Sequence, residues 1–438
     1  MTLISGFSRF DRAQRIKYIV EHSQLAVSER IHLDDYCAPE EQQQRVFSDM
    51  IENYIANFPI PMGVVTNMVI NDQSYVVPFV TEESSVVAAA AKAAKYWASR
   101  GGFRASVDAM TKKGQVHFIW NGNQEHISRL FTGIKSKLLD ATLGLTEKMR
   151  QRGGGITDIR LLNKTAQLPG YYQIDVSLDT SDAMGANFIN SCLETIAFAL
   201  QNLPELNANG NSVEIILSIL SNYTPDCKVH CRIECPIEEL TDWNKNLSGM
   251  AFAAKFKQAV DIANFDISRA VTHNKGIFNG VDAVLLATGN DWRATAAAAH
   301  AYASKDGTYR GLTTICLTDS MFRYELEFPL AIGTVGGITN IHPLVKNSLA
   351  MMNDPDARTL MMIVAASGLA TNFSAIASLI TTGIQEGHMR MHLSNIFNQL
   401  NTNHAERELI LGHFSGKTVS FAAVENFIGQ IRGEEIDN

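Results

Sequence analysis

The sequence predicts an α/β (α+β) protein in which a smaller unit is inserted into a large domain of mixed helices and strands. Three observations support this class. Segments with the period of a strand alternate with segments of helical period along most of the chain. Residues 110–225 follow the order β-α-β-β-α-β, which is the ferredoxin-like arrangement. The chain beyond residue 375 carries only helical patterns, and 438 residues suffice for about two or three domains.

The first 109 residues are expected to form helices, then a hairpin, then one further helix. Residues 12–58 contain amphipathic stretches of helical period. Residues 59–80 predict a β-hairpin, because apolar runs flank the turn sequence NDQS. The next helix is expected to begin with Thr81 as its N-cap, to carry acidic residues in its first turn, and to end at Gly101.

The insert, residues 110–225, is predicted from strands that alternate with long helices. A strand at 115–120 precedes one long helix, which the glycine triplet at 153–155 stops. Two strands flank the turn Pro169–Gly170, and a helix over 182–203 then leads to a strand over 212–220. The predicted domains are therefore a discontinuous large domain (1–109 and 226–375), the insert (110–225) and a helical C-terminal flap (376–438).

Three cysteines at four-residue spacing predict a strand rather than a metal site. In a strand, Cys227, Cys231 and Cys235 share one face, while charged residues and His230 occupy the other. Zinc motifs usually bring paired sets of ligands with spacers of about two to four residues. The sequence contains no second set beside these cysteines, so we expect no metal.

Residues 359–385 form an uncharged run that is long enough to cross a membrane. A transmembrane helix needs about 20 predominantly apolar residues. This run is diluted by serine, threonine and asparagine side chains. It therefore predicts one or two buried helices, and no membrane association is expected.

Composition limits the classes of function. The net charge of −8 argues against a general nucleic-acid-binding protein, which needs a basic face. Charged residues in the first 15 positions argue against a secretion signal, and the six cysteines form no disulfide framework, so a cytoplasmic location is expected. Motifs of the Rossmann, P-loop, zincin and α/β-hydrolase types are missing from the sequence.

Four places have the residue types of a functional site. Glu82 and Glu83 lie at the start of a helix, where carboxylates also complement the helix dipole. Lys275 and Asp291 lie among small apolar residues, and they form either a structural ion pair or part of an active site. The segment DAMGAN (182–187) joins a strand to a helix, so its amides can bind phosphate, or Asp182 can cap the helix. His388 and His392 share a helical face but have no evident third metal ligand.

Taken together, several segments resemble one family, hydroxymethylglutaryl-coenzyme A reductase, in its bacterial class II branch. The segments are ENYIANFPIPMGV, VPFVTEESSVVAAAAKAAK, GGG, DAMGAN, THNKGIFNGVDAVLLATGNDWRA and GHMRMHLSNI, and they occur in family order between about residues 51 and 397. One departure is Ala56, where the family usually has glycine. The resemblance implies a four-electron reduction of HMG-CoA to mevalonate and CoA with two NAD(P)H, or the reverse. It also implies that the insert is a non-Rossmann cofactor domain.

The resemblance also implies roles for individual residues. Lys275 matches the lysine that stabilises the negative charge on the carbonyl oxygen, and Glu83 matches the proton donor of aldehyde reduction. Asp291 matches the aspartate that links these two by hydrogen bonds. His388 matches the histidine that protonates the departing CoA thiolate, with a supporting role for His392.

Binding residues carry over in the same way. Ser85, Arg269, Thr272 and Asn279 match the pocket for the HMG group, and Asp182, Met184, Gly185, Ala186 and Asn187 match the cofactor-binding turn. NADH-preferring relatives carry an acidic residue where this chain has Thr146, and Lys148 follows closely. This difference favours NADPH over NADH, although Glu147 can restore an NADH preference if the helix register differs by one.

The resemblance further implies a homodimer, or a higher homo-oligomer, with its active site between subunits. Two alternatives stay open at this level. One is another enzyme of CoA thioesters, such as a hydrolase or acyltransferase, that uses Glu83 and Lys275 without a nicotinamide cofactor. The other is a non-catalytic CoA-binding protein, whose sequence would lack a catalytic position.

Overall fold

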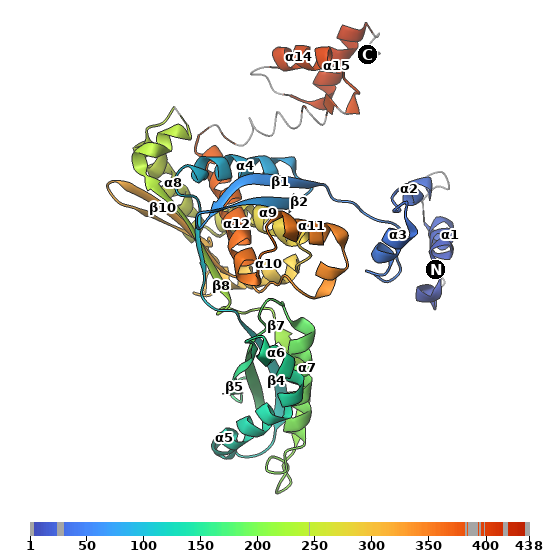
Figure 1. Ribbon diagram of the computed structural model, residues 1–438, viewed down its shortest axis with the longest axis vertical. Helices are drawn as coiled ribbons and strands as arrows, with labels where there is room; N and C mark the ends of the chain where they lie inside the picture. The colour runs from blue at the N-terminus through green and yellow to red at the C-terminus, as the bar shows by residue number, and fades with distance from the viewer. Residues whose placement is uncertain are drawn as a thin grey trace.

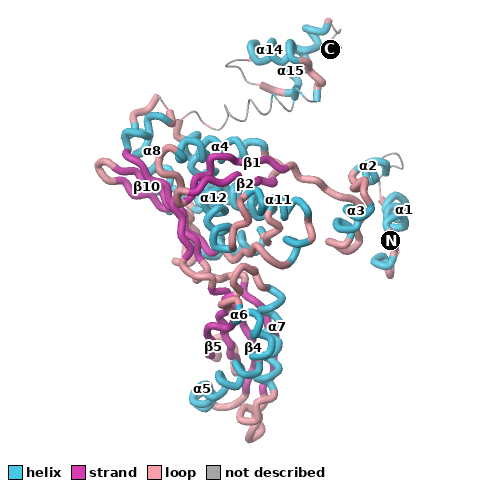
Figure 2. Tube along the Cα trace, viewed as in Figure 1, coloured by secondary structure: helices cyan, strands magenta, loops and turns pink. Residues whose placement is uncertain are grey.

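The computed structural model describes residues 4–23, 30–244, 246–381, 383, 393, 396–397, 399–414 and 419–433. Helices and antiparallel sheets are combined in a mixed fold, in agreement with the predicted class. The insert projects from the large domain, and the N-terminal helices and the C-terminal helices lie on other sides of it (Figures 1 and 2).

The N-terminal region contains three short helices, α1 (Arg12–His22), α2 (Arg30–Asp35) and α3 (Glu41–Ser48). Asp11 caps α1 in a capping box with Gln14. The expectation of helix up to residue 58 was wrong in its last part, because α3 ends at Ser48. Prolines at 59 and 61 disfavour helical backbone in the residues before them, which accounts for the extended approach to the hairpin.

The predicted hairpin is confirmed as β1 (Met62–Ile70) and β2 (Gln73–Val80), which pair antiparallel. Its turn uses Asn71 and Asp72, both with positive φ, as a two-residue hairpin turn requires. Helix α4 (Ser84–Ala98) follows, but its N-cap is Glu83 rather than Thr81. The Thr81 hydroxyl instead accepts the Glu83 N–H, and the helix begins at Ser84.

The insert has the predicted ferredoxin-like order of elements. It comprises β4 (Thr111–Trp120), α5 (Gln124–Ala141), α6 (Leu143–Gln151), β5 (Gly155–Asn163), β6 (Tyr171–Asp179), α7 (Ala186–Gln201) and β7 (Val213–Ser221). Its antiparallel sheet has the order β5-β6-β4-β7. The single long helix predicted before the glycine triplet is in fact two helices, which meet at Thr142. Buried side chains between Val116 and Val213 form a core of their own.

The large domain is built from a second antiparallel sheet and the helices that cover it. The sheet has the order β3-β8-β10-β9, with strands β3 (Arg104–Val107), β8 (Lys228–Pro236), β9 (Thr313–Leu317) and β10 (Met321–Pro329). The helices are α8 (Gly249–Phe265), α9 (Ile267–Ala287), α10 (Trp292–Ala303), α11 (Pro343–Met351) and α12 (Ala357–Leu379). Its core combines residues before the insert with residues after it, so the chain leaves this domain and returns.

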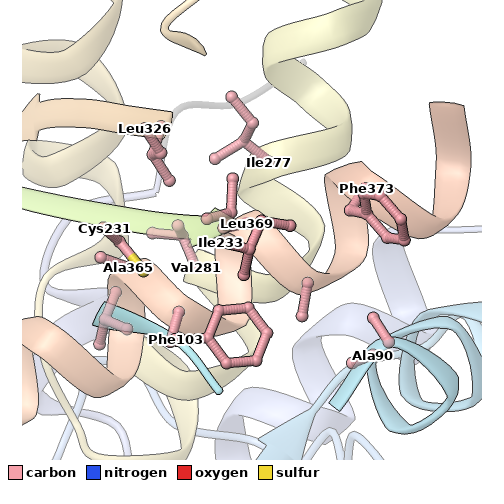
Figure 3. Close-up of a cluster of buried hydrophobic side chains, with 14 of the residues drawn as sticks. Ala90, Phe103, Cys231, Ile233, Ile277, Val281, Leu326, Ala365, Leu369 and Phe373 are labelled. Carbon is pink, nitrogen blue, oxygen red and sulfur yellow. The ribbon is translucent and has the colours of Figure 1, made fainter. Parts of the chain in front are cut away.

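The uncharged run of the sequence forms α12, a core helix. It is long and apolar enough to cross a membrane, but 89% of its most apolar window is buried inside the protein. Leu369 and Phe373 of α12 belong to the same buried cluster as Ile277 of α9 and Ile233 of β8 (Figure 3). The prediction of a buried helix is confirmed for the residues up to Leu379, and burial on all sides accounts for the lack of an amphipathic pattern.

The three spaced cysteines lie where the period-two pattern predicts. Cys231 and Cys235 point from β8 into the core, and Cys227, directly before the strand, is also buried. His230 lies on the opposite face, between the carboxylates of Asp108 and Glu327. The cysteines therefore pack as small apolar residues, and burial raises the pKa of the Cys227 thiol to about 11.

The C-terminal region contains α14 (His404–His413) and α15 (Phe421–Arg432), in agreement with the helical prediction. Asn403 and Glu406 form a capping box at the start of α14. Arg432 binds the Glu406 carboxylate at 2.8 Å and so ties the end of α15 to α14. A small separate core, from Leu393 to Ile428, holds these helices together.

Candidate active site

An ion pair between the start of α4 and the middle of α9 is the centre of the candidate site. Lys275 Nζ lies 3.3 Å from Glu83 Oε2. The Ser85 hydroxyl donates to Glu83 Oε1 at 2.6 Å, so both carboxylate oxygens have a partner. Residues almost 200 positions apart meet because α4 and α9 pack on neighbouring parts of the same core. Lys275 is thus paired, but its partner is Glu83 rather than Asp291.

The pair faces open space in the single chain. The neighbours Gly276 and Ile277 are buried, whereas the Lys275 side chain is 63% exposed. The Glu83 side chain is 35% exposed. An ion pair this accessible contributes only roughly 0–1 kcal/mol to stability.

Three predicted substrate residues share the helix of Lys275. Thr272, Lys275 and Asn279 are spaced three and four positions apart, which places them on one face of α9. Thr272 is exposed and Asn279 is half-buried. Arg269, one turn earlier, is also half-buried and follows the N-cap Asp266. The helix therefore presents a row of polar groups beside the Glu83–Lys275 pair.

Two residues next to Lys275, which the sequence interpretation left without a role, fix the position of α9. The His273 ring lies 2.6 Å from the Thr313 hydroxyl, and the Asn274 amide group donates to the Arg310 carbonyl and accepts the Leu312 N–H. Both side chains are fully buried, and burial lowers the pKa of His273 to about 3, so the imidazole is neutral. The only feature of the sequence that pointed to these two residues was the run of three polar residues, 273–275, before Gly276.

Asp291 lies at the corner between α9 and α10. Its carboxylate accepts the backbone N–H groups of Arg293 and Ala294 and thereby caps α10. The Arg293 guanidinium lies 3.5 Å away. These contacts of Asp291 are all with the first turn of α10, and its predicted hydrogen-bonded link to Lys275 and Glu83 stays a prediction.

The turn before α7 has the form expected of an anion-binding site. Gly185 is the N-cap of α7 with a φ of 86°, and a Cβ there would lie 2.5 Å from the Thr180 side chain. Only glycine fits such a position. The first N–H groups of α7 have no acceptor within the helix and its dipole is positive at this end. Met184, Ala186 and Asn187 are at least partly accessible beside it.

Asp182 does not cap α7, which corrects one of the two interpretations of DAMGAN. Its carboxylate accepts the N–H of Ala357 at 2.9 Å, at the start of α12 in the large domain. Its carbonyl accepts the N–H of Thr334 at 2.8 Å. Asp182 thus connects the insert to the large domain, and the residues that follow it are the accessible part of the turn.

The two residues predicted to select the cofactor differ in exposure. Thr146 is only 3% exposed, and its hydroxyl donates to the Thr142 carbonyl within α6. Lys148, by contrast, is exposed on the last turn of α6. Of the two, only Lys148 presents its polar group to solvent, where an anionic ligand has access. His388 and His392 lie outside the described residues.

The comparisons with known proteins agree on one family. The sequence profile of hydroxymethylglutaryl-coenzyme A reductase matches residues 11–393. A probable 3-hydroxy-3-methylglutaryl-coenzyme A reductase of Borreliella burgdorferi is 33% identical over 402 residues, which cover 92% of this chain and 90% of the relative. The Archaeoglobus fulgidus 3-hydroxy-3-methylglutaryl-coenzyme A reductase is 32% identical, with 90% and 86% covered.

Solved structures give the same result. A class II 3-hydroxy-3-methylglutaryl-CoA reductase from Streptococcus pneumoniae, bound to NADPH in open conformations, has a TM-score of 0.72 and 34% identity, and the match covers 86% of this chain and all of that chain. Another structure of the Streptococcus pneumoniae reductase has a TM-score of 0.73 and 32% identity, and it covers 98% of this chain.

Proposed function

Since the chain belongs to the hydroxymethylglutaryl-coenzyme A reductase family, and is therefore an NAD(P)-dependent oxidoreductase that acts on HMG-CoA, we propose that its active site is the polar surface around Glu83 and Lys275. The single observation that carries this proposal is their 3.3 Å contact, made across elements almost 200 residues apart. The fold is that of the class II enzymes. The proposed reaction uses two NAD(P)H per HMG-CoA and passes through mevaldyl-CoA and mevaldehyde.

Lys275 stabilises the charge that develops during reduction. Each hydride addition to a carbonyl carbon places negative charge on the oxygen, and a fixed ammonium there lowers the barrier by roughly 3–4 kcal/mol. The contact with Glu83 orients the ammonium before substrate arrives. Closure of the site in the assembled protein would remove water and strengthen this interaction.

Glu83 supplies the proton to the aldehyde oxygen in the second reduction. Its carboxyl is held between Lys275 and Ser85. It must take up a proton before this step, and it then passes that proton to the oxygen of the aldehyde. Asp291, at the corner beyond α9, would complete the link between the two once the site closes. His388 protonates the departing CoA thiolate, so that CoA leaves as a neutral thiol rather than as an anion.

The substrate and the cofactor are held by different domains in this proposal. Arg269 binds the HMG carboxylate through its guanidinium, with Ser85, Thr272 and Asn279 around the same group. The turn from Asp182 to Asn187 fits a dinucleotide, because Gly185 leaves the N-terminus of α7 open to an anion. The large domain therefore binds HMG-CoA, residues 110–225 bind the cofactor, and residues 376–438 form the flap.

We propose NADPH as the preferred cofactor. Lys148 is exposed near the glycine triplet that follows α6 and can attract a 2′-phosphate, while Thr146 offers no repelling charge. The NADPH-bound relative is consistent with this choice. The neighbouring Glu147 is also exposed, and it is the residue that would favour NADH.

A homodimer in the cytoplasm is proposed as the working unit. The segment before β1 exposes Ile51 and Phe58, which are 61% and 92% accessible in the single chain. The same segment borders an apolar cavity of about 660 Å³ beside α11 and the end of α9. A second subunit would cover this surface and close the site around Lys275.

The deciding experiment is cofactor oxidation by the purified protein with HMG-CoA, run in parallel with NADPH and NADH. The expected result is two cofactors oxidised for each CoA released, with the larger kcat/KM for NADPH. CoA release from a folded protein without cofactor oxidation would instead indicate a hydrolase or acyltransferase. Binding of HMG-CoA with no turnover would indicate a non-catalytic CoA-binding protein.

A further inference from the structure

A short segment after β10 connects the cofactor turn to the corner that carries Asp291. It consists of Gly333, Thr334 and Val335 and is called the strut here. On one side, the Gly333 N–H donates to Asn290 Oδ1 at 2.9 Å. On the other side, the Thr334 N–H donates to the Asp182 carbonyl at 2.8 Å. Two adjacent residues thus bind the two halves of the proposed active site.

The corner side of the strut is rigid. The Asn290 N–H donates to the Leu285 carbonyl at 2.9 Å, which ties it to α9, the helix of Lys275. Its amide group donates to the Thr288 hydroxyl at 3.1 Å, and Thr288 is fully buried. Asp291 follows directly as the cap of α10. Asn290 is therefore bonded to the end of α9 and directly precedes the cap of α10.

The turn side is held equally firmly. Ala183 and Val335 form a parallel β-bridge. The Ala183 carbonyl accepts both the Thr180 hydroxyl, at 2.6 Å, and the ammonium of Lys112, at 3.2 Å. Lys112 is only 1% exposed, so this contact is shielded from water. Together with the bond from Asp182 to α12, these contacts fix the turn to the large domain.

The strut and the cofactor turn are in direct backbone contact at Gly333. A Cβ on Gly333 would lie 2.4 Å from the Met184 nitrogen and 2.8 Å from the Asp182 carbonyl oxygen. These distances are shorter than any van der Waals contact of carbon, so backbone meets backbone here. The position of the turn relative to the corner is set by direct contact rather than by flexible side chains.

We propose that Gly333–Val335, anchored by Asn290, is a strut that sets the distance and orientation between the cofactor turn and the Lys275–Asp291 region. This inference rests on the proposed placement of the cofactor at the Asp182–Asn187 turn. Asn290 is a positioning residue, because it acts through Gly333 and not on substrate. Hydride transfer requires the donor carbon and the acceptor carbonyl in near-attack geometry, and a misplacement of about 1 Å can cost about 100-fold in rate.

Asn290→Ala tests the strut, because it removes the acceptor for the Gly333 N–H. We expect kcat to fall by about 10–100-fold while the Kd for NADPH changes by less than about threefold. The isotope effect measured with NADPH deuterated at the transferred position should rise, because hydride transfer becomes slower relative to the other steps. Asn290→Asp keeps an oxygen acceptor and should restore most of the rate.

Two further variants separate positioning from stability. Gly333→Ala pushes the turn away from the strut and should also raise the isotope effect. Asn71→Ala is the matched control: Asn71 likewise bridges backbone groups, those of Ala105, but in the β1–β2 turn, so its loss should lower the melting temperature without changing the isotope effect.

The outcomes distinguish this inference from the proposed function. A fall in kcat for Asn290→Ala with an unchanged isotope effect and a lower melting temperature would show that Asn290 only stabilises the fold. A weaker NADPH Kd at unchanged kcat would overturn the positioning role. If the unmodified protein does not oxidise NADPH with HMG-CoA, the proposed function itself fails, and the strut is not the cause.

Discussion

Replacement of Lys275 by alanine separates a catalytic role from a structural one, because the two roles differ in magnitude. The pair with Glu83 is 3.3 Å long, and its side chains are 63% and 35% exposed. After allowance for solvent screening, such a pair stabilises the fold by roughly 0–1 kcal/mol. Loss of a group that stabilises the oxyanion costs about 10²–10³-fold in kcat, or roughly 3–4 kcal/mol of the barrier.

Lys275→Ala should therefore lose about 100–1,000-fold in kcat for both reduction steps while its melting temperature stays within a few degrees of the parent. Oxidation of NADPH with HMG-CoA, and separately with free mevaldehyde, measures the two steps. Lys257→Ala is the control, because Lys257 forms a comparably exposed pair with Asp261 within α8 and has no predicted role in the site. Turnover near the parent value in Lys275→Ala would refute the oxyanion role, and a large loss of stability would refute the assignment of the pair to catalysis.

Three further predictions concern the thiolate, the cofactor and pH. His388→Gln should impair reduction of HMG-CoA by at least about 10-fold more than reduction of free mevaldehyde, and equal losses would argue against thiolate protonation. Lys148→Glu should lower the NADPH-to-NADH ratio of kcat/KM by roughly 10-fold; an unchanged ratio would remove Lys148 from cofactor selection. Burial raises the pKa of Asp282 to about 7. The folded chain thus keeps a proton that the unfolded chain releases near pH 4, and the contribution of Asp282 to stability is present at pH 4 and is lost as pH rises to about 7. In Asp282→Asn, urea unfolding should show a smaller loss of stability between pH 5 and pH 8, by on the order of 1 kcal/mol, and identical losses in parent and variant would contradict the burial argument.

Periodicity alone predicted much of the fold. The alternation around Cys231 gave the strand and the direction of its side chains, and the β-α-β-β-α-β order gave the insert. The uncharged run gave a core helix. These predictions succeed because side-chain spacing reflects which face of an element is buried. Boundaries were less accurate: Thr142 divides a predicted single helix, because its hydroxyl and N–H both bond to the Leu139 carbonyl and close the first segment.

Motif resemblance predicted candidate site residues, but it did not predict most of the contacts that they make. The sequence linked Lys275, Glu83 and Asp291 in one predicted site. The structure pairs Lys275 with Glu83, and Asp291 caps α10, so the link to Asp291 stays a prediction. Asp182 stays a predicted residue of the cofactor turn, and the sequence did not predict that its carboxylate accepts the Ala357 N–H at the start of α12. Such contacts join positions 100 or more residues apart, and no local spacing encodes them.

The sequence by itself therefore determined the class of fold, the core-facing side of the strand that carries Cys231, and the family to which the chain belongs. Only the tertiary structure decided which polar groups meet, because that depends on how separately formed helices pack around one core. The strut is the clearest case, because Asn290, Gly333 and Asp182 share no pattern in the sequence. In the structure, the Gly333 N–H donates to the Asn290 side chain, and the adjacent Thr334 N–H donates to the Asp182 carbonyl. Close packing of the interior leaves few arrangements of these segments, and it is this constraint that places them together.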